Sequence, residues 1–115
     1  MTVIRLQEVV VDCRDPRALV GFWAAVLRAV PVVRTDDWAY IDSDLLGTRL
    51  AFQRVPEIKS TKNRVHLDLE VDDIADERDR VTALGAFALG ELVVDEQGPF
   101  QVMVDPEGNE FCLVS

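Results

Sequence analysis

Hydrophobic and polar residues alternate along positions 64–72, where the sequence reads RVHLDLEVD. A period of two predicts a β-strand, because successive side chains of a strand point to opposite faces. The apolar face of this strand would pack under the helix that follows, and the polar face would carry His66, Asp68 and Glu70. His66 is the only histidine of the chain, so the role of that polar face is the first question that the sequence raises.

Two segments have apolar residues at intervals of three or four, which predicts helices. The expected helical ranges are 15–30 and 72–86. In the first, Asp15 suits the N-cap, and Pro31 is expected to stop the helix because proline cannot continue one. In the second, Asp72 or Asp73 would be the N-cap and Gly85 would end the helix.

The remaining apolar stretches are short and rich in β-branched residues, which predicts further strands. These strands are expected at residues 3–13, 38–42, 48–55, 91–94, 100–105 and 110–115. The last two would be joined by the turn DPEGN, whose residue types favour a tight turn. Residues 56–63 have the polar composition of a linker.

The two halves of the chain repeat the same pattern at an offset of 58 residues, which places Glu8 on His66 and Asp15 on Asp73. Each half contains a strand, a helix and up to three strands, and an internal repeat of this size indicates the architecture. We therefore predict an α+β fold of two βαβββ modules that form one curved mixed sheet with the helices outside. The single domain would span residues 1–115, with module one at about 3–57 and module two at about 63–115.

The concave face of such a sheet would be the floor of a cavity, which is where small ligands bind. His66 and Asp68 would lie on this floor, and the repeat adds Glu8. A carboxylate among apolar neighbours needs a partner, because an unpaired buried charge is costly. That partner could be a metal ion, an arginine or a water-filled cleft.

The chain has 115 residues and a net charge of −9, so we expect no binding to nucleic acid or to anionic membranes. The negative charge is explained by solubility alone or by attraction of a cationic ligand. No apolar run of about 18 residues predicts a membrane span, and no signal-peptide pattern is present, so we expect a cytoplasmic protein. Two cysteines cannot make a disulfide framework and are expected to be reduced.

Three stretches together resemble a known superfamily: EVVVDCRDP followed by an FW pair, HLDLEVDD, and DPEGNEFCLV near the end. They are similar to the vicinal oxygen chelate superfamily, which includes glyoxalase I, bleomycin-resistance proteins, fosfomycin-resistance transferases and extradiol dioxygenases. The closest likeness is to small glyoxalase-like domain proteins, over about residues 5–115. The resemblance implies paired βαβββ modules, often in homodimers, with a divalent metal in the cavity.

The resemblance also implies metal ligands on the first and last strands of each module. The matching positions are Glu8, Gln53, His66 and Cys112. Enzymes of the superfamily generally have a glutamate at the last of these positions, where this chain has Cys112, and Glu110 lies two residues earlier on the same strand face. A neutral imidazole beside a carboxylate suits zinc, nickel, manganese or iron, and a cysteine thiolate would favour zinc.

Each of these residues also has a structural interpretation. Glu8 could pair with an arginine, Cys112 could be a small buried hydrophobe, and His66 could bind substrate or water instead of metal. Four residues are candidates for the apolar wall of the cavity or for ordinary core packing: Trp38, Tyr40, Phe100 and Met103. Asp68 is expected to contact substrate.

Two functions follow from the resemblance. The first is a metal-dependent lyase or isomerase acting on a small substrate with vicinal oxygens, with Glu8 or Glu110 moving a proton. The second is a non-catalytic protein that sequesters a cationic ligand, as bleomycin-resistance proteins do. Both functions predict a small-molecule ligand and a homodimer.

Overall fold

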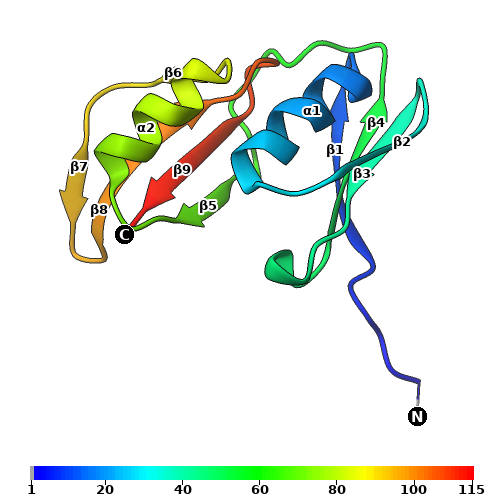
Figure 1. Cartoon of the computed structure of the whole chain (residues 1–115), viewed down its shortest axis with the longest axis horizontal. Helices are drawn as coiled ribbons and strands as arrows, with labels where there is room; N and C mark the ends of the chain where they lie inside the picture. Colours follow the sequence, from blue (N-terminus) through cyan, green and yellow to red (C-terminus); the bar gives the residue numbers. More distant parts are fainter. Residues whose placement is uncertain (1) are drawn as a thin grey trace. The chain divides into compact units, whose positions relative to one another are not determined.

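The computed structural model describes residues 2–115, and these divide into two compact units between Ile58 and Lys59. Each unit has one long helix and its own hydrogen-bonded sheet (Figure 1). The predicted α+β class with two βαβββ modules is confirmed. Within the described residues the strands form two mixed sheets, where the sequence predicted a single curved one.

The first unit contains a four-stranded sheet in the order β1-β4-β3-β2. Its elements are β1 (Glu8–Cys13), α1 (Pro16–Leu27), β2 (Pro31–Thr35), β3 (Trp38–Ile41), the short 3-10 helix η1 (Asp44–Leu46) and β4 (Arg49–Arg54). The first and last strands, β1 and β4, pair in parallel, and the other pairs are antiparallel. The helix α1 packs on β2, β3 and β4.

The second unit contains a five-stranded sheet in the order β5-β9-β8-β6, with β7 also paired to β8. Its elements are β5 (Leu67–Glu70), α2 (Ile74–Ala83), β6 (Phe87–Ala88), β7 (Val93–Asp95), β8 (Gly98–Val104) and β9 (Glu110–Val114). Here too the first and last strands, β5 and β9, pair in parallel. The helix α2 packs on β6, β8 and β9.

Both helices begin as the sequence predicts. The side chain of Asp15 accepts a hydrogen bond from the amide of Ala18, and Asp73 does the same for Asp76. The end of α1 differs from the prediction, because the helix stops at Leu27 and Arg28 adopts a left-handed conformation with φ of 53°. Pro31 instead begins β2, a strand that the sequence analysis missed.

Alternation along β8 and β9 separates the core of the second unit from its open face. Met103, Phe111 and Leu113 are almost completely buried, together with Val81 of α2. Burial of side chains of this size stabilises the fold by about 1.5–3 kcal/mol each. Because strand side chains alternate, the residues at even positions on β8 and β9 point to the opposite face, where the candidate site lies.

Candidate functional site

The second unit has a cavity of about 570 Å³ on the sheet face opposite its core. The polar residues of the RVHLDLEVD stretch line it, as the alternation predicts: His66, Asp68 and Glu70. From β9 come Glu110 and Cys112, and from β8 comes Phe100. The cavity therefore combines carboxylates, one imidazole, one thiol and an aromatic wall.

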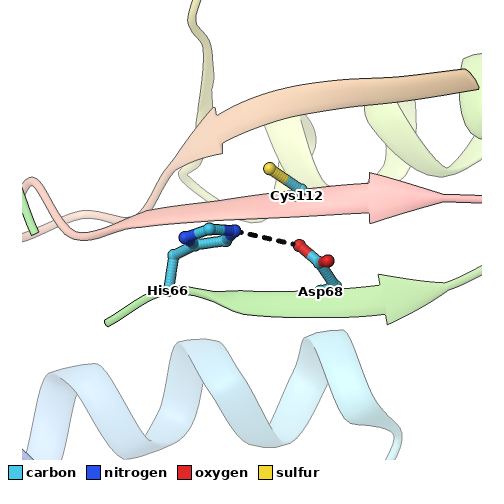
Figure 2. Close-up of side chains that lie close together, drawn as sticks. All are labelled: His66, Asp68 and Cys112. Carbon is cyan, nitrogen blue, oxygen red and sulfur yellow. Dashed lines mark ion pairs between the residues drawn. The ribbon is translucent and has the colours of Figure 1, made fainter. Parts of the chain in front are cut away.

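Three of these side chains lie close enough to share one ion. A ring nitrogen of His66, a carboxylate oxygen of Asp68 and the Sγ of Cys112 all lie within 4.8 Å of one another. The parallel register places Asp68 directly opposite Cys112 on adjacent strands, and His66 Nε2 lies 3.3 Å from Asp68 Oδ1. Figure 2 shows the imidazole and the carboxylate turned toward each other, with the thiol rising from the neighbouring strand.

The Cys112 thiol is held in its protonated form. Burial raises the pKa of Cys112 above its usual value, and the negative charge of Asp68 and a hydrogen bond to Asp68 raise it further. Only 9% of this residue is exposed. A metal cation that bound the sulfur of Cys112 would therefore release the thiol proton to solvent.

Glu110 lies at the same cavity but is engaged by basic residues. Its carboxylate accepts hydrogen bonds from the Lys62 ammonium and the Asn63 amide, and Lys59 Nζ lies 3.8 Å away. The Lys62 hydrogen bond is the largest cause of the lowered pKa of Glu110, so this carboxylate is ionised. Asn63 is itself bound to the amide of Glu110 and to Asn109, which anchors the segment before β5 to the start of β9.

Comparison with protein families identifies the family of the chain. The family model described as "Glyoxalase-like domain" matches residues 8–114. The chain belongs to the glyoxalase-like domain family. The resemblance drawn from the sequence motifs is thereby confirmed. No curated protein matches the chain.

Several solved structures share the fold at low sequence identity. A protein from Agrobacterium tumefaciens has a TM-score of 0.82 at 18% identity, over 98% of both chains. A glyoxalase-related enzyme from Fulvimarina pelagi has a TM-score of 0.78 at 18% identity, over 97% of this chain and 88% of that one. A glyoxalase/bleomycin resistance protein from Albidiferax ferrireducens T118 has a TM-score of 0.69 at 16% identity, over 95% and 97%.

In this glyoxalase-like domain, Glu8 is paired with an arginine. Its Oε1 lies 3.9 Å from a guanidinium nitrogen of Arg49, which is the residue opposite it on β4. Arg49 also pairs with Asp42 at 3.2 Å and stacks over the ring of Tyr40 at 4.0 Å. Glu8 therefore has the arginine partner that was one of its expected alternatives. Tyr40 contacts guanidinium groups in the first unit.

The strand register shows that Gln53 is not the counterpart of Cys112 in the repeat. Asp68 pairs with Cys112 in the second unit, and Val10, its counterpart 58 residues earlier, pairs with Ala51. Ala51 is therefore the register counterpart of Cys112. Gln53 lies two residues further along β4, opposite Asp12. It lines a different cavity of the first unit together with Trp38.

Phe100 and Met103, both expected on the cavity wall, lie on opposite faces of β8. Phe100 lines the cavity of the second unit, whereas Met103 is fully buried in the core. An odd separation along a strand makes it impossible for both to share a face. The expectation for Met103 is therefore corrected to core packing.

The His–Asp–Cys cluster fits a divalent transition metal. Zinc accepts histidine nitrogen, cysteine sulfur and carboxylate oxygen at about 2.0–2.3 Å, and three protein ligands with one open position are typical of catalytic zinc sites. Donor atoms within 4.8 Å of one another need only small side-chain movements to reach such distances. Asp68 was predicted to contact substrate and not to be a metal donor, although a spacing of two from His66 in an alternating stretch places both on one face.

No helix in residues 2–115 is long and apolar enough to span a bilayer.

Proposed function

We propose that this glyoxalase-like domain is a metal-dependent lyase or isomerase that acts on a small substrate with vicinal oxygens. His66, Asp68 and Cys112 would hold the metal. The observation that carries the proposal is that these three donors, from β5, the residue before it and β9, converge within 4.8 Å on the wall of a cavity of about 570 Å³. A cavity of this volume admits a small organic molecule.

When bound, the metal would supply Lewis-acid polarisation of a substrate carbonyl. The chain itself would supply the proton-transfer group. Of the two carboxylates expected for this role, Glu110 lines the cavity of the second unit, whereas Glu8 is paired with Arg49 in the first. Glu110 is ionised and is oriented by Lys62 and Asn63, so it can accept a proton from a substrate carbon placed beside it.

The donor set favours zinc over the harder cations. Cysteine and histidine are preferred by zinc, whereas manganese prefers oxygen ligands. Nickel and iron are the other metals that this mixed set could hold. Loss of the Cys112 proton would accompany metal binding, so the affinity should increase with pH.

The metal claim is tested by elemental analysis of untagged protein purified without chelator. We expect about one metal per chain in wild type and little or none in His66→Ala and Cys112→Ser, since removal of one of three ligands leaves an incomplete site. Glu70→Gln is the matched control, because Glu70 lies on the same strand and lines the same cavity but is outside the cluster. Equal metal content in wild type and His66→Ala would refute the assignment.

The substrate class is tested with acetohydroxamate, a small molecule with two vicinal oxygens. Isothermal titration should detect binding to the zinc-loaded protein and none to His66→Ala. Binding of equal strength to both proteins would show that the vicinal oxygens do not reach a metal at this cluster.

A second function, sequestration of a cationic ligand, is favoured by one specific observation. Both carboxylates expected to move a proton are ion-paired, Glu8 with Arg49 and Glu110 with Lys62. The cavity also has carboxylates at Glu70 and Asp95 and an aromatic wall at Phe100, which suit a cationic aromatic ligand. A binder should purify without metal and gain thermal stability with benzyltrimethylammonium, because a ligand of the folded state raises the melting temperature. A metalloenzyme should instead purify with bound metal and gain no thermal stability from benzyltrimethylammonium.

A further inference from the structure

The open face of the second sheet has two halves of different chemistry. The half formed by β9, β5 and the residue before β5 carries the polar groups of the cavity: His66, Asp68, Glu70, Glu110 and Cys112. The half formed by β8 is apolar, because the side chains that β8 turns to the cavity are those of Phe100 and Val102. The candidate metal cluster therefore lies beside an uncharged wall.

The register of β6 and β8 extends this apolar half to the edge of the sheet. Phe87 pairs with Val104, and the amide of Leu89 donates to the carbonyl of Val102 at 2.9 Å, which continues the same register. Residues that lie directly opposite each other on paired strands project to the same face. Phe87 and Leu89 are therefore on the cavity side of the sheet.

On β7, Val93 pairs with Phe100 and joins the same face. We call the following residues the apolar strip: Phe87, Leu89, Val93, Phe100, Val102 and Val104. Its outer members are open to solvent, with exposed fractions of 66% for Phe87, 53% for Leu89 and 46% for Val93. Apolar side chains exposed side by side mark a binding surface more often than apolar side chains exposed singly.

The corresponding half of the first sheet is covered by the chain itself. In the strand order of that sheet β3 takes the place of β8, and the guanidinium carbons of Arg49 and Arg34 lie 4.0 Å and 5.4 Å from the ring centroid of its Tyr40. Among residues 2–115, no guanidinium stacks over Phe100 in this way. The apolar strip of the second unit is thus left open beside the cavity.

The apolar strip is in register with the candidate metal cluster. Val102 pairs with Cys112 on one side and lies opposite Leu89 on the other. Because neighbouring strands are about 4.8 Å apart, the backbone of Leu89 lies about 10 Å from that of Cys112 across the sheet. A ligand held at the metal cluster could therefore lay an apolar tail over Val102 as far as Leu89.

We propose that the substrate of the metal site carries a linear apolar tail about 10 Å long, attached to its vicinal oxygens. This inference rests on the proposed function, since the metal would anchor those oxygens. The tail would cross β8 over Val102 and end against Leu89 and Phe87. A charged group on the tail would be desolvated on the apolar strip without a partner, so the substrate class is an uncharged medium-chain alkyl or acyl compound.

The tail is tested by isothermal titration of the zinc-loaded protein with alkyl hydroxamates of increasing length. From acetohydroxamate to octanohydroxamate, we expect the affinity to increase about twofold to fourfold for each added methylene, because each one leaves water for an apolar surface. Leu89→Gln and Phe87→Gln should each weaken octanohydroxamate about threefold and leave acetohydroxamate unchanged. Val94→Thr is the matched control, because Val94 is 71% exposed but lies on the opposite face from its neighbour Val93.

Three outcomes would overturn the proposal. Equal affinities for acetohydroxamate and octanohydroxamate would exclude the tail while leaving the metal site in place, whereas no binding of either hydroxamate would contradict the proposed function and the tail with it. Octanamide has the tail without the second oxygen and should bind about tenfold more weakly than octanohydroxamate, so equal binding would show a surface independent of the metal. Light scattering should give one mass for wild type and Leu89→Gln, and a lower mass in the variant would show that a second copy covers the apolar strip.

Discussion

The turn that leads into β9 is held by one buried carboxylate, and its removal should be costly. Asp105 is 1% exposed and accepts hydrogen bonds from the amides of Glu107 and Asn109, each at 2.9 Å, and from Asn109 Nδ2 at 3.1 Å. A hydrogen bond to a charged group contributes about 1.5–3 kcal/mol. The three bonds share one acceptor group and their donors are half-buried, so we expect Asp105→Ala to lower the free energy of unfolding by about 3 kcal/mol.

Urea denaturation followed by circular dichroism measures this loss, and the melting temperature should fall by about 10 °C. Asp105→Asn keeps one acceptor oxygen for the backbone amides and should lose about half as much. Asp95→Ala is the matched control, because Asp95 is an exposed aspartate at the end of β7 that accepts a hydrogen bond from the amide of Gln97. If Asp105→Ala and Asp95→Ala destabilise equally, burial of the turn carboxylate does not explain its contribution.

Further predictions concern the charges, the core and the assembly. The folded-state pKa of Cys112 is raised, so its contribution to stability is complete below the pKa of the unfolded thiol and is lost as pH rises through the folded value. Alkaline unfolding should therefore begin at higher pH in Cys112→Ser than in wild type. Because the pKa of Glu110 is lowered, its contribution is lost as pH falls, and Lys62→Met should raise the titration midpoint of Glu110 in carbon-detected spectra. Met103→Ala should cost about 2–5 kcal/mol of stability in denaturation experiments while metal content stays unchanged, since Met103 is core. Light scattering should give twice the chain mass of 12.9 kDa if the expected homodimer forms.

Patterns of period two and helical spacing were sufficient to predict the βαβββ modules, both N-caps and the face on which His66 lies. Those features depend on local chemistry: an aspartate at each cap and strict alternation along β5. The short strands β2 and β6 were missed, since Pro31 interrupts the first pattern and the second has only two residues.

The ligand assignments depended on information that the sequence does not contain. Placing Gln53 opposite the right residue needs the register of β1 and β4, and a slip of two residues keeps the same face and so leaves the pattern unchanged. The partners of Glu110 come from the segment before β5, 48 residues away for Lys62, and no local signal marks such a pairing. Met103 could have been excluded, because alternation alone separates it from Phe100.

The parallel pairing of β5 with β9 sets the order in which the site can form. Leu67 pairs with Phe111, a separation of 44 residues, so the pairing must close a long stretch of chain before its contacts compensate for the lost entropy. His66 and Asp68 emerge from the ribosome long before Cys112, and until then they have no third donor beside them. A nascent chain can thus complete the sheet of the first unit while the His66–Asp68–Cys112 cluster of the second does not yet exist.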